Sequence, residues 1–428
     1  MNLRDSLSYA LDKTLELGAD KVEGLINESE KKELNIEAGK MSLFRTTFQN
    51  SFSIEAIKDS KQGSISINKI DKDSIDSAIK VLMDNVDSSQ PDEANDISEK
   101  QEAEKFNKGT LSPDLNVMYD HLDEFNHYVR DSHKKIIIEA AMLDHTSNIS
   151  HIMNTNGVDF QISKGIYNFS PMFTAKDKEK TSSFNYTYFS ALELNDKIHN
   201  KSYLSNLLHQ TEEQINTFQI KDKFVGSIIV TPHCLPDFLS FIENNISDGS
   251  IISGTSIYKD KIGQKVANEN FNLSSSPLDK RLASGYFVTS DGYKAENIDI
   301  IKNGILKNHI LSLYGANKTG GKRVSNSGGA HIVSQGSQSL EDMIKDIDKG
   351  ILLCRFSGGS PSDNGDFSGV AKNSYYIENG KIKYPVIETM VSGNISNMFL
   401  NINNISSENI NFGDRILPWI SFNGITIS

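Results

Sequence analysis

Histidine and cysteine side chains are the residues of this chain best suited to hold a catalytic metal ion, and their spacing argues against a local metal motif. None of the ten histidines is followed by glutamate, and no two of them stand three, four or five residues apart, so a zincin helix is absent. His121, His127 and His133 recur every six residues, but on a helix that step turns by about 600°, which separates neighbours around the axis. His233 and Cys234 are both potential ligands, yet adjacent residues rarely bind one ion together, so we expect a buried structural cysteine there.

Carboxylates and hydroxyls near the C-terminus offer a second chemistry, either acid/base catalysis or calcium binding. Asp363, Asp366 and Glu378 lie in or beside loops rich in glycine and serine. Such carboxylates more often make local turns, and side chains like Asp366 and Ser368 hydrogen-bond neighbouring backbone, which holds a loop in one shape. Dinucleotide and serine-hydrolase chemistry has no support, because the chain carries neither a G-x-G-x-x-G fingerprint nor a G-x-S-x-G elbow.

The stretch 359–398, GSPSDNGDFSGVAKNSYYIENGKIKYPVIETMVSGNISNM, resembles the C-terminal domain of the TldD/PmbA family. Its GDFS at 365–368, IENG at 377–380, YPV at 384–386 and GN at 393–394 follow that family's order and spacing, in the manner of its PmbA (TldE) branch. The resemblance extends from the GAD at 18–20 to the closing GITI at 424–427. It implies a cytoplasmic metallopeptidase complex that processes or degrades small or unfolded peptides, in which only the TldD branch carries a zinc-binding HExxxH helix.

The zinc positions that the resemblance implies are occupied here by side chains that cannot bind a metal. The matching strand is 224–230, and the next helix begins near Pro236, which suits a first helical turn. The two histidine positions fall on Phe241 and Ile246 and the glutamate on Ile242, within apolar spacing typical of a core-facing helix. Aliphatic and aromatic groups offer zinc no lone pair. We therefore expect no cofactor in this chain, and zinc only in a TldD-type partner.

Length, charge and cysteine content bound the class of protein. A chain of 428 residues exceeds what one hydrophobic core usually serves, so two or more domains are expected. The formal net charge of −12 argues against direct nucleic-acid binding. Two cysteines cannot build a disulfide framework, Asp5 and Asp12 interrupt any signal-peptide core, and no run approaches the roughly 20 apolar residues that span a bilayer. These features predict a cytoplasmic globular protein without a membrane segment.

Apolar periodicity predicts an α+β first domain at 1–87, a charged connector at 88–108 and a middle α/β region at 109–222. In the first domain, helical stripes over 2–17 and near Asp73 flank short alternating stretches, which predict antiparallel strands at 33–37, 44–48, 52–57 and 64–67. The connector is too polar to fold alone, so we expect it to be exposed. In the middle region we expect a helix near 113–132, a buried strand near 135–143, and a strand marked by Phe184, Tyr186 and Tyr188, whose rings serve sheet packing or, less commonly, peptide stacking.

The C-terminal domain, 223–428, is dominated by strand-like pieces that end at glycine and asparagine. Asn303 with Gly304, and Asn379 with Gly380, predict tight hairpins. One helix is expected at about 339–349. The predicted fold is therefore α+β: a helix and antiparallel-sheet domain first, then a mainly antiparallel domain with a curved or barrel-like sheet.

Three functions remain open. The first is a noncatalytic subunit that pairs with a TldD-type zinc peptidase, completes its cleft and helps hold an extended peptide along a sheet edge. The second is an autonomous metallopeptidase with zinc ligands at unfamiliar positions, and the third is a stand-alone binding or adaptor protein. For the first, a homodimer is as open as a heterodimer, and the candidate contacts with peptide or partner are Asp366, Phe367, Ser368, Gly393 and Asn394.

Overall fold

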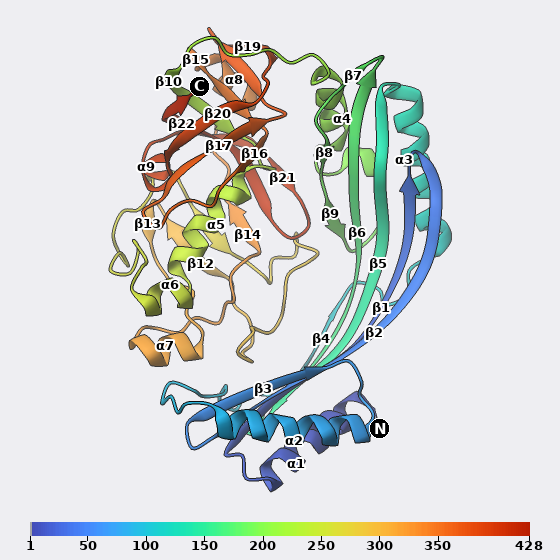
Figure 1. Ribbon diagram of the computed structural model, residues 1–428, viewed down its shortest axis with the longest axis vertical. Helices are drawn as coiled ribbons and strands as arrows, with labels where there is room; N and C mark the ends of the chain where they lie inside the picture. Colours follow the sequence, from blue (N-terminus) through green and yellow to red (C-terminus); the bar gives the residue numbers. More distant parts are fainter. Residues whose placement is uncertain (1) are drawn as a thin grey trace.

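The computed structural model describes residues 2–428, which form two large sheets with helices packed on them (Figure 1). Long, curved strands dominate the first sheet, whose order is β3-β2-β1-β5-β6-β4, with three short strands also paired to β6. Its strands are β1 (Lys21–Glu37), β2 (Lys40–Lys58), β3 (Lys61–Ile67), β4 (Glu104–Lys108), β5 (Ile136–Asn154), β6 (Asp159–Asp177), β7 (Lys180–Thr181), β8 (Asn185–Tyr186) and β9 (Phe189–Ala191).

Two pairs of helices pack at opposite ends of this sheet, and each pair forms its own hydrophobic core with the strands. At one end Leu7 and Ile79 pack with Ile26 of β1, and at the other Phe125 and Leu208 belong to a core with Leu143 of β5. Because β1 pairs with β5 from Glu23↔Asn154 to Glu37↔Ala140, residues 1–87 and 109–222 share one sheet. The helices are α1 (Leu3–Glu16), α2 (Lys72–Ser88), α3 (Leu115–Ser132) and α4 (Leu204–Glu213), with a short 3-10 turn at Ile198–Asn200.

The charged stretch 88–108 differs from the exposed connector that its composition predicts. Ala94, Ile97 and Ser98 are buried, and β4 pairs in parallel with β6. The side-chain amide of Asn154 donates hydrogen bonds to the Ser98 backbone and hydroxyl oxygens. A polar segment is ordered here because the edge of β6 and an asparagine supply hydrogen-bond partners that it lacks when considered alone.

The second sheet has the order β13-β12-β11-β14-β22-β10-β15-β18-β19 and is mostly antiparallel, with parallel pairing of β10 with β15 and of β14 with β22. It is curved and open, so the α+β class is confirmed without a closed barrel. Its strands are β10 (Phe224–Val230), β11 (Leu273–Ser275), β12 (Ile298–Lys302), β13 (Ile305–Leu306), β14 (His331–Val333), β15 (Lys349–Leu353), β16 (Arg355–Gly358), β17 (Asp366–Lys372), β18 (Tyr375–Glu378), β19 (Lys381–Pro385), β20 (Thr389–Asn394), β21 (Ile402–Asn411) and β22 (Ile416–Ile427).

Both predicted asparagine-glycine hairpins are present. Asn303 and Gly304 join β12 to β13, and Asn379 and Gly380 join β18 to β19, all four with positive φ as tight hairpin turns require. The strand predicted around Phe184 shortens to the two residues of β8. The helices of this half are α5 (Leu235–Ile246), α6 (Asp248–Ser253), α7 (Leu313–Thr319), α8 (Leu340–Lys345) and α9 (Ile395–Leu400).

Candidate functional site

Helix α5 follows strand β10, as the sequence predicts, and its apolar face lies in the core. Pro236 is in its first turn. Phe241, Ile242 and Ile246 are 6 %, 1 % and 0 % exposed and belong to the largest hydrophobic cluster of the C-terminal sheet. The side chains at the expected zinc positions therefore contribute packing, and their chemistry does not fit a metal ion.

The other residues that the sequence suggests as metal ligands are engaged elsewhere. His233 Nε2 lies 2.9 Å from the Thr187 hydroxyl, and burial lowers the pKa of His233 to about 4. Cys234 is buried, which raises the pKa of its thiol. His133 Nδ1 lies 3.0 Å from Glu212, whereas His127 Nδ1 lies 3.3 Å from Asp123, so these two histidines have different partners. Across residues 2–428, no group of three or more His, Cys, Asp or Glu side chains is arranged to hold a metal ion.

The two C-terminal motifs lie on neighbouring strands. β17 and β20 pair so that Asp366 is opposite Asn394 and Phe367 is opposite Gly393. The Asn394 side-chain amide donates hydrogen bonds to Asp366 Oδ1 and to the backbone oxygen of Asn364, each over 2.9 Å. Hydrogen bonds from Asn394, and then from Asn364, lower the pKa of Asp366. The pairing thus brings together residues that lie 28 positions apart, and it holds an exposed carboxylate ionised.

The motif strands also pack against α5. The ring of Phe367 lies 5.4 Å from that of Phe238 in an edge-on arrangement, and only 5 % of Phe367 is exposed. Gly365 has a φ of +92°, and a β-carbon there would lie 3.1 Å from the Phe241 ring. Phe367 is consequently part of the core, while Asp366 and Ser368 are exposed to a potential ligand.

The carboxylates considered for acid/base work do not act as one group. Asp366 accepts from Asn394, whereas Glu378 accepts a hydrogen bond from the Tyr376 hydroxyl over 3.1 Å. Asp363 is an exposed loop residue. These three positions are therefore explained by local structure.

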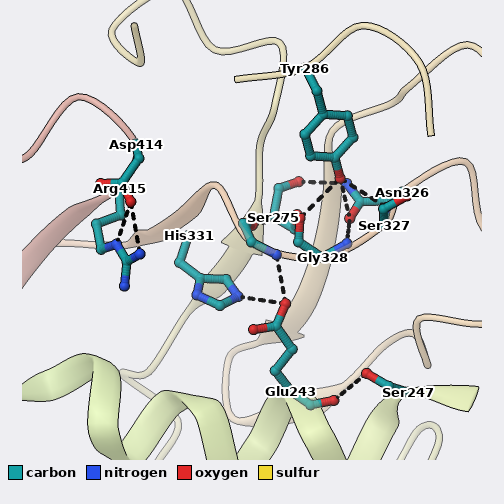
Figure 2. A network of polar contacts seen from close by, with 11 residues as sticks. Glu243, Ser247, Ser275, Tyr286, Asn326, Ser327, Gly328, His331, Asp414 and Arg415 are labelled. Atoms are coloured by element: carbon teal, nitrogen blue, oxygen red, sulfur yellow. Dashed lines mark hydrogen bonds and ion pairs between the residues drawn. The ribbon is translucent and has the colours of Figure 1, made fainter. Parts of the chain in front are cut away.

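A polar network that sequence patterns did not reveal joins α5 to the loop before β14 (Figure 2). The backbone N–H of Gly329 donates to Glu243 Oε1 over 2.6 Å, and His331 Nε2 lies 3.5 Å from the same oxygen. Burial by itself raises the pKa of Glu243, but His331 and the Gly329 N–H outweigh it and hold the pKa below its ordinary value. Gly328, Gly329 and Ala330 all have positive φ, which turns the backbone toward Glu243.

This network is suited to holding the Glu243 carboxylate ionised rather than to nucleophilic attack. The nearby Ser275 hydroxyl donates to the Gly329 carbonyl, and the Ser247 hydroxyl donates to the backbone oxygen of Glu243. Both hydroxyls are thus committed to the backbone. The Gly-Gly-Ala run before β14 is the one local feature of the sequence that points to this network. Its partner Glu243 is 86 residues away in the chain, so sequence patterns do not link the two.

No helix in the described part of the chain is long and apolar enough to cross a membrane.

Residues 225–428 match the family model described as the PmbA/TldA metallopeptidase C-terminal domain. The chain is 34 % identical over 189 residues to metalloprotease PmbA of Escherichia coli O157:H7, a match that covers 42 % of this chain and 41 % of that protein. It is 27 % identical over 303 residues to a metalloprotease PmbA homologue of Buchnera aphidicola, covering 69 % of this chain and 67 % of the relative. The crystal structure of TldE from Thermococcus kodakarensis shares the fold, with a TM-score of 0.88, 18 % identity, and coverage of 99 % of this chain and 100 % of that one.

Proposed function

Because the chain belongs to the TldD/PmbA family, we propose that it is a noncatalytic, TldE-like subunit of a metallopeptidase complex that processes or degrades small or unfolded peptides. One observation carries the proposal: Phe241, Ile242 and Ile246, which stand where the family resemblance places the zinc motif, are buried apolar side chains of α5. A zinc peptidase uses its ion to polarise the scissile carbonyl and to lower the pKa of a bound water. These positions cannot hold that ion, so the zinc chemistry falls to a TldD-type partner.

The subunit's own role is to complete the cleft and to help hold the peptide. Orientation of a substrate can lower a reaction barrier by several kcal/mol without any new chemical group. We assign the contact with peptide or partner to the exposed Asp366 and Ser368 and to Asn394, with Phe367 and Gly393 supporting them from the core side.

An unpaired sheet edge supports assembly with another chain. β3 pairs with β2 only from Phe52 onward, so the first part of β2, residues 40–51, has β1 on one side alone. Leu43, Phe44 and Phe48 on that edge are 41 %, 54 % and 74 % exposed. A long apolar edge of this kind is normally covered, and we expect a dimer or larger by light scattering. Both cysteines are free thiols, which suits the reducing cytoplasm where we place the complex.

The decisive experiment compares the purified chain, a TldD-type zinc peptidase and their mixture on one unstructured, fluorescence-quenched peptide, each with and without a chelator. We expect no stoichiometric zinc by elemental analysis and no cleavage by this chain alone, but faster, chelator-sensitive cleavage in the mixture. Chelator-sensitive cleavage by the chain alone would favour an autonomous metallopeptidase. If the cleavage rate of the TldD-type peptidase is unchanged in the mixture, the result favours a stand-alone binding protein.

A paired substitution tests the assigned contact. Ser368→Arg places a long cation on the exposed face of β17 and is expected to abolish most of the rate increase without unfolding the chain. Ser64→Arg makes the same change on the exposed face of β3, far along the chain from this site, and serves as the control. Equal stimulation by the two variants would remove β17 from the contact surface.

A further inference from the structure

A cavity lies between the β8 region of the first sheet and the segment that leads into α5. Several chain segments that are widely separated in sequence build its wall, which is rich in aromatic rings. We call it the junction pocket and define it by Tyr186, Tyr188, Tyr203, Arg355, Phe412 and Trp419. The Tyr203 ring meets Trp419 edge-on at 5.3 Å, and Tyr188 stacks on Phe412 at 5.3 Å, so the rings hold one another in place.

The interior of the junction pocket is mainly apolar and carries almost no charge. No Asp, Glu or Lys is among the described residues that line it. Burial lowers the pKa of His233 to about 4 and raises the pKa of Cys354 to about 12, so at neutral pH the imidazole is neutral and the thiol keeps its proton. Arg355 is therefore the single charged side chain in the wall at pH 7. Such a cavity favours an uncharged, hydrophobic group inside it.

Arg355 is fixed at the pocket and has no anionic partner in residues 2–428. Its NH1 donates to the backbone oxygen of Phe184 over 2.6 Å, and its guanidinium carbon lies 4.0 Å from the centre of the Phe184 ring. Burial lowers the pKa of Arg355, and no carboxylate of the described chain offsets that effect. A guanidinium has five N–H donors in a planar fork that matches a carboxylate. One N–H group of Arg355 donates to Phe184, and the remaining N–H groups of the guanidinium can donate to an anion.

We infer that the junction pocket binds the carboxyl-terminal residue of a peptide, with an apolar or aromatic side chain in the cavity and the terminal carboxylate on Arg355. A fixed cation beside an apolar cavity selects a ligand that has one anionic end and one hydrophobic group close to it. The carboxyl-terminal residue of a peptide has both on the same carbon. The choice of a peptide as the ligand rests on the proposed function, whereas the pairing of carboxylate and apolar group rests on the pocket.

Trp419 makes the inference directly testable, because it is the only tryptophan of the chain and it lines the pocket. Its fluorescence is followed while the full-length protein is titrated with N-acetylphenylalanine, N-acetylphenylalanine amide or N-acetylglycine. We expect the free acid to bind about tenfold more tightly than the amide, as one charge-assisted contact implies. N-acetylglycine, which has the carboxylate without the side chain, should leave the fluorescence unchanged. Equal affinities for acid and amide, or no response of Trp419 to either, would overturn the inference.

Variants separate the carboxylate contact from the cavity. Arg355→Gln should reduce the affinity for the acid to that for the amide, and Arg355→Lys, which keeps the positive charge, should retain part of the preference. Arg323→Gln is the matched control, because Arg323 also stacks on an aromatic ring, 3.4 Å from the centre of Tyr293, outside the pocket. Tyr186→Ala, at a half-exposed position, should weaken acid and amide alike. An unchanged acid preference in Arg355→Gln contradicts the inference.

The readout requires neither a partner nor cleavage. Binding without stimulation of a TldD-type peptidase would leave the pocket standing and remove the proposed function. If the chain stimulates the peptidase but the fluorescence of Trp419 does not respond, the proposed function stands and the inference about the pocket fails.

Discussion

The side-chain amide of Asn394 donates a hydrogen bond to the Asp366 carboxylate over 2.9 Å, and this contact joins the two glycine-containing motifs of the C-terminal domain. The same asparagine caps helix α9, because its Oδ1 accepts from the backbone N–H of Asn397 over 3.1 Å. One side chain thus fixes a strand pair and the start of a helix.

Replacing that asparagine should therefore cost stability. Asn394→Ala removes the cap and the contact with Asp366, and we expect the free energy of unfolding to fall by about 1 kcal/mol. Urea titration followed by circular dichroism measures the change. Asn403→Ala, which removes an exposed amide from β21, should stay within about 0.5 kcal/mol of the parent. Equal losses in both variants would contradict the capping role.

Gly365→Ala should destabilise the motif for a conformational reason. Its φ of +92° disfavours any side chain, and the added methyl would lie 3.1 Å from Phe241. We expect a loss of about 1–2 kcal/mol. Gly359→Ala is the matched control, because no atom lies within 4 Å of the added methyl and its φ is not in the left-handed region. A neutral Gly365→Ala variant would show that this backbone conformation is not required.

Glu243→Ala should weaken the network that joins α5 to the loop before β14. The substitution leaves the Gly329 N–H without its acceptor and removes the carboxylate beside His331, so we expect a loss of about 1–3 kcal/mol at pH 7. The pKa of Glu243 is held low in the folded protein, so the stability it contributes is present above the pKa of the unfolded chain and is lost as pH falls through the folded value. The penalty should accordingly shrink in acid. Asn244→Ala, exposed on the next position of α5, should change little at either pH.

Glu23 should show the opposite dependence on pH. Burial, and then the neighbouring Glu55, raises its pKa to about 7, and its Oε2 has no hydrogen-bond partner within residues 2–428. Stability that depends on its proton is complete below the ordinary pKa of 4.5 and is lost as pH rises through 7. Glu23→Gln keeps the shape without the titration. The free energy of unfolding of Glu23→Gln should equal that of the parent near pH 4.5 and exceed it by up to about 3 kcal/mol at pH 8.

Unfolding experiments at a series of pH values between about 4.5 and 8 measure this trend. Glu102→Gln, at an exposed position, controls for the loss of one negative charge. A pH-independent difference between Glu23→Gln and the parent would show that Glu23 does not titrate in this range.

Local sequence information was sufficient for the features that depend on neighbouring residues. The helical stripe of α5 and the buried positions of Phe241, Ile242 and Ile246 follow from apolar spacing alone. The turns at Asn303 and Asn379 follow from the tolerance of asparagine-glycine pairs for positive φ. Motif spacing identified the family from residues 359–398, and the apolar side chains at the expected zinc positions on α5 are the reason that we predict no zinc there.

Features that depend on long-range contacts were decided by the tertiary structure. The segment 88–108 is ordered because β6 offers it an edge, and composition carries no information about a distant edge. Glu243 meets Gly329, and Asp366 meets Asn394, only after strands and helices far apart in sequence have packed together. The junction pocket depends in the same way on two sheets, since Arg355 and Trp419 of the second sheet meet Phe184 and Tyr186 only when the β8 region lies against that sheet. Periodicity reports which face of an element is buried, but the identity of the facing residue is set by the packing of the whole chain.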